Sequence, residues 1–164
     1  MNDRTSLHAA GTLVLTGLYQ FQKPGEYSVR VQQFGEFERG FPVLAEDTAS
    51  VRVLPFDASR LGARCEELFR PLRTHSSSRT DIPQQVRVAA LYSVRSDLVL
   101  PYLDWMAREF ASRYACRAIR RVGTTRAERL LNALAARRDK VGEAARKAMK
   151  MPVENTSPVW EMAY

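Results

Sequence analysis

The chain has 164 residues, a mass of 18.6 kDa and a formal net charge of +7. That length accommodates one ordinary domain or two small ones, and it excludes a large multidomain enzyme. With 45% hydrophobic and 26% charged residues, the composition is that of a soluble globular protein, which argues against a disordered, collagen-like or coiled-coil chain.

The basic excess is concentrated in the C-terminal two-thirds of the chain. Residues 1–56 carry five basic and six acidic side chains, a balance of −1, whereas residues 57–164 carry 20 and 12, a balance of +8. A pI near 9.8 biases the chain toward acidic partners, and this split assigns that bias to the second part.

Membrane insertion and export are not expected from the sequence. The longest apolar-rich stretch, 9–21, is interrupted by Gly, Thr and Gln and is too short to span a bilayer. Its leader, residues 1–4, has no net positive charge, unlike a signal peptide. We therefore expect a cytoplasmic location by default, the alternative being a piece of a larger exported protein.

The first part of the chain has the two-residue period of strands. Apolar residues over 13–21 lead into the turn sequence 23–26, in which proline and glycine favour the required dihedral angles, and apolar and polar residues alternate over 27–31. This pattern predicts a half-buried hairpin. Residues 33–46 predict an irregular connection, and the alternation over 51–55 predicts a third strand.

Two short segments of this part, PGEYSVRV over 24–31 and SVRVL over 50–54, resemble the last strands of a bacterial immunoglobulin-like or fibronectin-like sandwich. The resemblance implies that the Tyr27 hydroxyl is tied to the backbone of the preceding corner. A sandwich needs about seven strands, so either the helices cover this sheet or the chain is a piece of a longer protein, and at least one strand edge stays open. The side chains expected to bury one face are Tyr27, Val29, Val51 and Val53.

The remainder has the period of helices. Apolar residues recur at i, i+3, i+4 and i+7 in six segments, whereas the serine-rich stretch 74–82 predicts a loop or linker. We expect these helices to pack as successive antiparallel pairs. The six predicted helices span 58–71, 84–94, 98–110, 112–122, 125–138 and 140–150. The residues expected to be buried include Leu91, Leu103, Ile119, Leu131 and Leu134.

An internal repeat appears when the chain is shifted against itself by 28 residues. Segment 90–96 then matches 118–124, and the apolar residues three to seven positions further along match as well. Each unit reads as a helix, a tight turn with a Ser96 or Thr124 cap, and a second helix; a third, partial copy begins at Ala144. One such pair cannot bury its own apolar face, so neighbouring units are expected to stack.

These units resemble HEAT-like repeats of the short kind, with about 30 residues each. The residues that carry the likeness are VRVAAL over 86–91, YACRAIRRVGT over 114–124 and KVGEAARKAM over 140–149. The resemblance implies a scaffold or binding surface rather than an enzyme. Two complete units are fewer than a free-standing solenoid has, which again suggests a fragment or a fold that leans on the strands.

Together these patterns predict an α+β chain, with a small and incomplete antiparallel immunoglobulin-like segment followed by an all-α array of HEAT-like helical hairpins. The expected organisation is an immunoglobulin-like strand segment over 1–56, a connecting helix and serine-rich linker over 57–82, HEAT-like helical repeats over 83–150 and a C-terminal tail over 151–164.

Catalytic signatures are largely missing from the sequence. His8 and His75 have no partner at metal-ligand spacing, and no nucleophile-elbow, zincin, dinucleotide or phosphate-loop motif occurs. The sequence thus predicts no enzyme, no cofactor and no metal. Cys116, near three arginines, is the one nucleophile whose pKa such neighbours could depress. The favoured interpretation of Cys65 and Cys116 is a reduced, buried thiol on an apolar helix face.

Segment 113–150 holds twelve basic side chains against three acidic ones, a local charge of +9. Stacked helices could display these arginines as a basic stripe, although ordinary solvated helix surfaces have the same composition and no aromatic residue interleaves with them. The predicted function is a noncatalytic protein–protein interaction or scaffold module of the HEAT-repeat type; its partner is another protein, which the sequence does not identify and which the net charge biases toward an acidic one. The alternative is a basic helical nucleic-acid binder. The oligomeric state is left open. The candidate interaction surface comprises Arg113, Arg117, Arg120, Arg121, Arg126, Arg129, Arg137 and Arg138.

Overall fold

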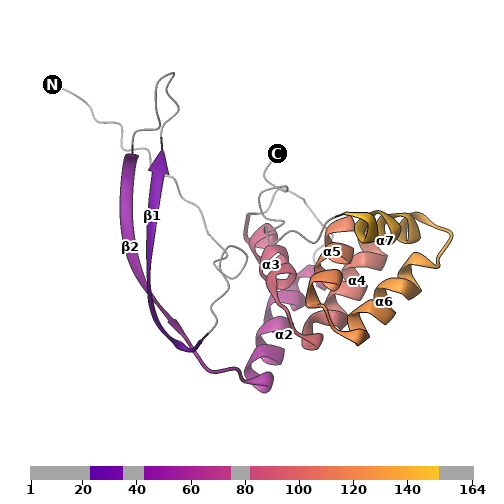
Figure 1. Ribbon diagram of the computed structural model, residues 1–164, viewed down its shortest axis with the longest axis horizontal. Helices are drawn as coiled ribbons and strands as arrows, with labels where there is room; N and C mark the ends of the chain where they lie inside the picture. The colour runs from indigo at the N-terminus through magenta and orange to yellow at the C-terminus, as the bar shows by residue number, and fades with distance from the viewer. Residues whose placement is uncertain (1–22, 35–42, 75–81, 152–164) are drawn as a thin grey trace. The chain divides into compact units, whose positions relative to one another are not determined.

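The computed structural model describes residues 23–34, 43–74 and 82–151 (Figure 1). Over these ranges the fold is α+β, as predicted: a two-stranded antiparallel sheet is followed by six α-helices. The strands and the helices fall into two compact units that divide between Asp57 and Ala58. None of the described helices is long and apolar enough to cross a membrane.

The sheet unit consists of β1 (Gly25–Phe34) and β2 (Val43–Val53). Tyr27 lies opposite Val51 in the antiparallel register, and a register shift follows Gln33. Because side chains alternate between the two faces, one face is mainly apolar and the other polar. The Tyr27 hydroxyl donates a hydrogen bond of 2.7 Å to the Lys23 carbonyl, the contact that the immunoglobulin resemblance implies.

The expectation about the connection between the strands is corrected. Residues 33–46 do not form one long irregular connection, because β1 continues to Phe34 and β2 already begins at Val43. The early part of β2 escaped detection because Asp47 takes a position on the apolar face and hides the alternation. The other predicted hairpin strand, 13–21, lies outside the described residues.

The four side chains expected to bury one sheet face do share that face. They are only half-buried, however, because no described layer covers a sheet of two strands. The residues concerned are Tyr27, Val29, Val51 and Val53.

The helical unit follows the predicted order. Its elements are α2 (Ala58–Thr74), α3 (Ile82–Ser93), the 3-10 turn η1 (Asp97–Val99), α4 (Leu100–Phe110), α5 (Arg113–Val122), α6 (Thr125–Ala135) and α7 (Lys140–Lys150). The predicted helix over 125–138 ends three residues early, and the predicted helix over 58–71 continues past Pro71 to Thr74.

Side-chain caps fix where these helices begin. The side chains of Ser112, Thr124 and Asp139 accept hydrogen bonds from the backbone N–H three residues on, at the first turns of α5, α6 and α7. Helix α5 ends at Gly123, whose φ of 71° is the left-handed conformation that glycine adopts readily. Helix α4 ends at Ala111 with a φ of 47°, which is uncommon for a residue with a Cβ atom.

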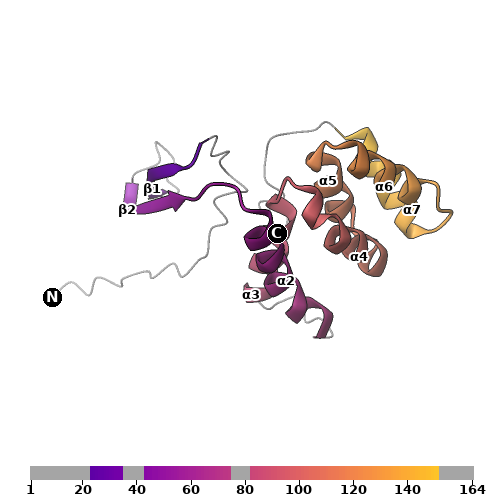
Figure 2. The ribbon, with the colours of Figure 1, turned by 90° about the horizontal axis from the view of Figure 1, so that it is seen from below.

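Helix α5 lies at the centre of the helical unit, where it contacts α3, α4, α6 and α7. Five consecutive residues, 115–119, are buried, so its whole circumference is covered at this level. Helices α6 and α7 pack alongside each other (Figure 2). The predicted core is confirmed, since all five of its residues are buried: Leu91, Leu103, Ile119, Leu131 and Leu134.

Helix α2 belongs to this core as well. Cys65, Phe69 and Leu72 are buried in the same cluster as the later helices. The segment expected to be a connecting helix is therefore part of the helical unit, because its apolar face packs against α3 and η1. Most of the serine-rich stretch that follows lies outside the described residues, and so does the C-terminal tail after Met151.

Several positions 28 residues apart are buried to a similar extent. Leu91 and Ile119 are both fully buried, and so are Leu103 and its counterpart Leu131 to within a few per cent. Ser96 and Thr124 both cap the element that follows them, in extended backbone conformations. The two corners are also adjacent in space, because the Thr124 hydroxyl donates a hydrogen bond of 2.5 Å to the Asp97 carboxylate.

Candidate interaction site

The predicted basic stripe is not a single surface. Arg117 is only 6% exposed, which removes it from the surface on which we expected it. It lies on α5, and the sequence pattern failed here because α5 is covered on all sides rather than on one apolar face. A long aliphatic stem lets an arginine pack in such a position while its head group is hydrogen-bonded.

Arg120 is half-buried and serves the end of α7. Its Nη1 donates a hydrogen bond of 3.0 Å to the Ala148 carbonyl and another to the Met151 carbonyl. The last carbonyls of a helix lack intrahelical partners and carry partial negative charge, so a guanidinium there is favourable. This arginine therefore joins α5 to α7 instead of facing a ligand.

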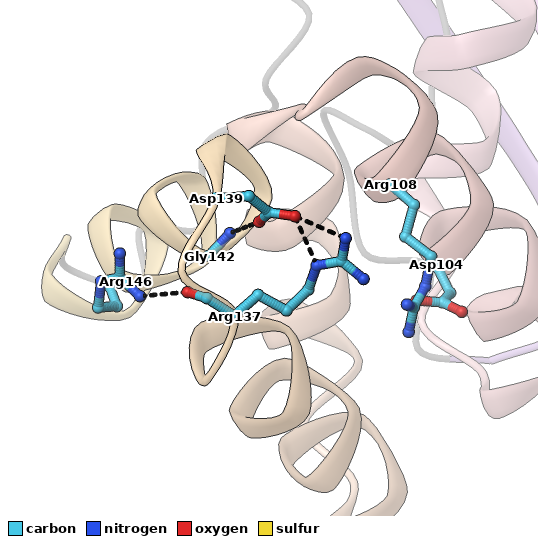
Figure 3. A network of polar contacts seen from close by, with 6 residues as sticks. All are labelled: Asp104, Arg108, Arg137, Asp139, Gly142 and Arg146. Atoms are coloured by element: carbon cyan, nitrogen blue, oxygen red, sulfur yellow. Dashed lines mark hydrogen bonds and ion pairs between the residues drawn. The ribbon is translucent and has the colours of Figure 1, made fainter.

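Arg137 belongs to a polar network at the α6–α7 corner (Figure 3). Its Nε and Nη2 donate hydrogen bonds of 3.0 and 2.6 Å to Oδ2 of Asp139, whose Oδ1 accepts from the Gly142 N–H at 3.0 Å. The guanidinium and this N–H hold the pKa of Asp139 at about 2. Arg146 Nη1 donates to the carbonyls of Ala135 and Arg137 and so closes the corner from the other side.

Gly142 is the residue that permits this close corner. A Cβ atom at this position would lie 2.0 Å from the Arg137 carbonyl oxygen, closer than any real contact allows. One feature of the sequence indicates this close contact: a glycine inside a helix is unfavourable unless packing requires it.

The remaining five arginines of the predicted set differ in their availability. The Arg113 guanidinium lies 4.9 Å from the ring centre of Tyr114 and donates to its hydroxyl, and Arg121 is half-buried. Arg126, Arg129 and Arg138 are exposed and form no hydrogen bond or ion pair with another described residue. Only these three are therefore fully available to a partner.

The thiols are not activated. Burial raises the pKa of the Cys116 thiol to about 11 and also raises that of Cys65, which is the opposite of the depression considered from the neighbouring arginines. Both cysteines are free and buried, which confirms the favoured interpretation. The described part of the chain contains no group of His, Cys, Asp and Glu residues arranged to hold a metal ion.

One surface feature was missed by the sequence analysis. Four aromatic side chains of α2 and α4 form a connected series, which we call the aromatic ladder: Phe69, Tyr102, Trp105 and Phe110. The Phe69 ring lies 4.9 Å from that of Tyr102 and 5.0 Å from that of Trp105, and Trp105 packs edge-on against Phe110 at 5.4 Å.

The aromatic ladder runs from the core to the surface. Phe69 is buried, Tyr102 and Trp105 are half-buried, and Phe110 is 48% exposed. Helix α4 ends at Phe110, whose ring is covered on one side by Trp105 and otherwise exposed. An exposed ring held by a second aromatic ring is a rigid apolar contact point with little side-chain entropy left to lose.

No protein-family model, curated protein or solved structure matches this chain significantly.

Proposed function

We propose that this chain is a noncatalytic protein–protein interaction module, in which HEAT-like helical repeats preceded by immunoglobulin-like strands present the aromatic ladder to a partner protein. The observation that carries the proposal is the half-exposed end of the ladder, Trp105 and Phe110, anchored through Phe69 in the core. Protein interfaces are enriched in aromatic anchors of this kind, and their binding energy is concentrated in a few of them.

Matching features at positions 28 residues apart support the repeat interpretation. Leu103 and Leu131 have matching burial, the caps Ser96 and Thr124 recur at the same offset, and Asp97 links the two corners directly. Stacked units that each bury half of their apolar surface in a neighbour would have this arrangement. A repeat array with buried thiols suits binding rather than catalysis.

The burial and contacts of the arginines favour a protein over a nucleic acid as the partner. Binding to phosphates needs several free basic groups in a continuous groove or stripe, often with aromatic stacking platforms. Here Arg117 is buried, Arg120 binds carbonyls and Arg137 pairs with Asp139. The free group Arg126, Arg129 and Arg138 suffices to attract an acidic protein, since charges at an interface rim mainly raise the association rate.

The proposal is tested with a photo-crosslinking residue in place of Phe110 of the full chain. The matched control carries the same residue in place of Met149, which is 40% exposed on α7. A protein that crosslinks at 110 and not at 149 is then purified, and its affinity is measured for the wild type, Phe110→Asp and Met149→Asp. We expect Phe110→Asp to weaken binding by about tenfold or more, and Met149→Asp by less than about twofold.

The dependence of the affinity on salt concentration distinguishes protein binding from nucleic-acid binding. Affinity for the protein partner should fall only modestly between about 50 and 200 mM salt, whereas phosphate binding falls by orders of magnitude over that range. If a labelled oligonucleotide binds with such a steep slope, and Arg126→Glu, Arg129→Glu and Arg138→Glu together abolish that binding while Phe110→Asp does not, the chain is a nucleic-acid binder and the proposal is wrong.

A further inference from the structure

The charge beside the aromatic ladder differs in sign from the charge of the helical unit as a whole. Helix α4, which carries three of the four rings, has two acidic side chains and one basic one. Asp104 and Arg108 neutralise each other, because the Arg108 Nε lies 2.7 Å from the Asp104 Oδ1. Among the described residues, Glu109 is therefore left as the charged side chain of α4 that has no ion pair.

Glu109 lies beside the exposed end of the ladder. It follows Trp105 by four residues, so the two side chains are on the same side of α4, and it directly precedes Phe110. Its side chain is exposed. Two exposed arginines near the end of α2, Arg70 and Arg73, form no ion pair with it. The carboxylate of Glu109 is thus available next to two aromatic rings.

A second carboxylate lies at the other end of the α4 rings. The Tyr102 hydroxyl is beside the carboxylate of Glu66 on α2, and burial, followed by this carboxylate, raises the pKa of Tyr102. Glu66 is half-buried. Carboxylates therefore flank the series of rings at both of its ends, and Glu109 is the more accessible of the two.

The rings and the carboxylates attract the same kind of group. The face of an aromatic ring is electrostatically negative, so a cation placed over it is attracted. A carboxylate attracts the same cation directly. The chain already contains one such contact, since the Arg113 guanidinium lies 4.9 Å from the centre of the Tyr114 ring. No described basic side chain lies over Trp105 or Phe110 in this way.

We propose that the partner protein contacts this end of the ladder with an arginine or lysine next to an apolar residue. The basic side chain lies against Trp105 and Phe110 and pairs with the Glu109 carboxylate, while the apolar residue covers the rest of the exposed rings. This inference rests on the proposed function and names the chemistry of the partner segment that occupies its site.

Other segments are selected against at this site. An apolar segment without a basic group would remove water from Glu109 and leave the carboxylate unpaired, which costs free energy. An acidic segment would be repelled by Glu109 and by the ring faces. The partner can still be acidic elsewhere, because the free arginines Arg126, Arg129 and Arg138 belong to α6 and the turn after it and not to the helices that carry the ladder.

A library of labelled short peptides, randomised at each position, is the probe for the full chain. We expect the wild type to select arginine or lysine next to an apolar residue. The tightest peptide is then compared with an analogue in which glutamine replaces the basic residue. The analogue should bind at least about threefold more weakly, because it loses both the cation–aromatic contact and the ion pair.

Glu109→Lys adds a second readout. This variant places a positive charge where the basic residue of the peptide binds, so its affinity for the tightest peptide should fall about tenfold. The matched control is Glu128→Lys, an exposed acidic residue of α6 whose replacement changes the net charge equally. The control should stay within about twofold of the wild type at about 0.15 M salt, where long-range charge effects are screened. Circular dichroism checks that both variants remain helical.

The outcomes separate this inference from the proposed function. Selection of peptides without a basic residue, no selection at all, or equal weakening by Glu109→Lys and Glu128→Lys would each overturn the inference. A protein that crosslinks at 110, and whose binding is weakened by Phe110→Asp but not by Glu109→Lys, would support the proposed function and contradict the inference. The absence of any protein that crosslinks at 110 would contradict the function itself.

Discussion

The sheet unit and the helical unit differ in where their stability comes from. No described side chain of the sheet unit is buried, and cross-strand contacts such as Arg30–Glu46 hold its strands together. The helical unit surrounds α5 on all sides and buries five consecutive residues of it, 115–119. The difference implies that the helical unit folds on a core of its own, whereas the described part of the sheet unit contains no such core.

The largest effects should come from the matched leucines of the helical unit. Leu103→Ala and Leu131→Ala each remove a buried side chain, so each should lower the free energy of unfolding by about 2–5 kcal/mol. If the two positions are equivalent members of a repeat, the two losses should agree to within about 1 kcal/mol. Urea denaturation followed by circular dichroism at 222 nm measures both.

A contrasting variant in the sheet sharpens this comparison. Val51→Ala should change the unfolding of the helices by less than about 0.5 kcal/mol, because the half-buried Val51 belongs to the other unit. A loss of more than about 2 kcal/mol would show that the two units share one cooperative transition.

The α6–α7 corner gives the next largest effect. Gly142→Ala places a methyl group where the Arg137 carbonyl lies, so α7 must shift, at a cost of about 1–3 kcal/mol. The same substitution at Gly62 in α2 is the control, since a Cβ atom there meets nothing within 4 Å. Gly62→Ala should stabilise the helical unit by about 0.5–1 kcal/mol, because alanine is the better helix former. If both substitutions changed the free energy of unfolding by the same amount and in the same direction, the close contact between Gly142 and the Arg137 carbonyl would be contradicted.

A smaller increase in the free energy of unfolding is expected from a substitution at the end of α4. Ala111 has a φ of 47°, a conformation that costs free energy for alanine and not for glycine. Ala111→Gly should therefore raise the free energy of unfolding by about 0.5–1 kcal/mol. Thermal unfolding measures it, and a lower midpoint in the variant would mean that the methyl group of Ala111 contributes more to packing than the strain costs.

The smallest effect concerns the pH dependence of the exposed pair Arg137–Asp139. The pKa of Asp139 falls from 3.8 to about 2 on folding, so the stabilisation is fully present above about pH 4 and is lost as the pH falls through 2. Asp139→Asn keeps the cap on the Gly142 N–H and removes the charge. The wild type should be more stable above pH 4, and the difference should vanish near pH 2. A constant difference across this range would contradict the linkage.

Much of the helical unit was predictable because its signals are local. Periodicity located all six helices, and Thr124 marked the start of α6 through capping chemistry that depends on neighbouring residues only. The burial of Arg117 was not predictable in this way, because it depends on how many helices surround α5. Asp47 likewise hid the start of β2, since a charged residue on the apolar face breaks the alternation that indicates a strand.

The candidate site was less accessible to sequence reasoning. The density of arginines suggested a basic surface, but Arg120 and Arg137 are occupied by carbonyl groups and by Asp139, contacts between segments that no spacing rule reports. The aromatic ladder combines Phe69 with residues more than 30 positions away, so only the packed structure brings it together.

Hydrogen exchange of the full chain at several protein concentrations tests most directly the claim that the two units draw their stability from different sources. The α5 amides should exchange slowly and at the same rate at every concentration. The β1 amides of Gly25–Phe34 should exchange much faster than the α5 amides, because no described side chain of the sheet unit is buried. Protection of β1 that is as high as that of α5 and independent of concentration would contradict it.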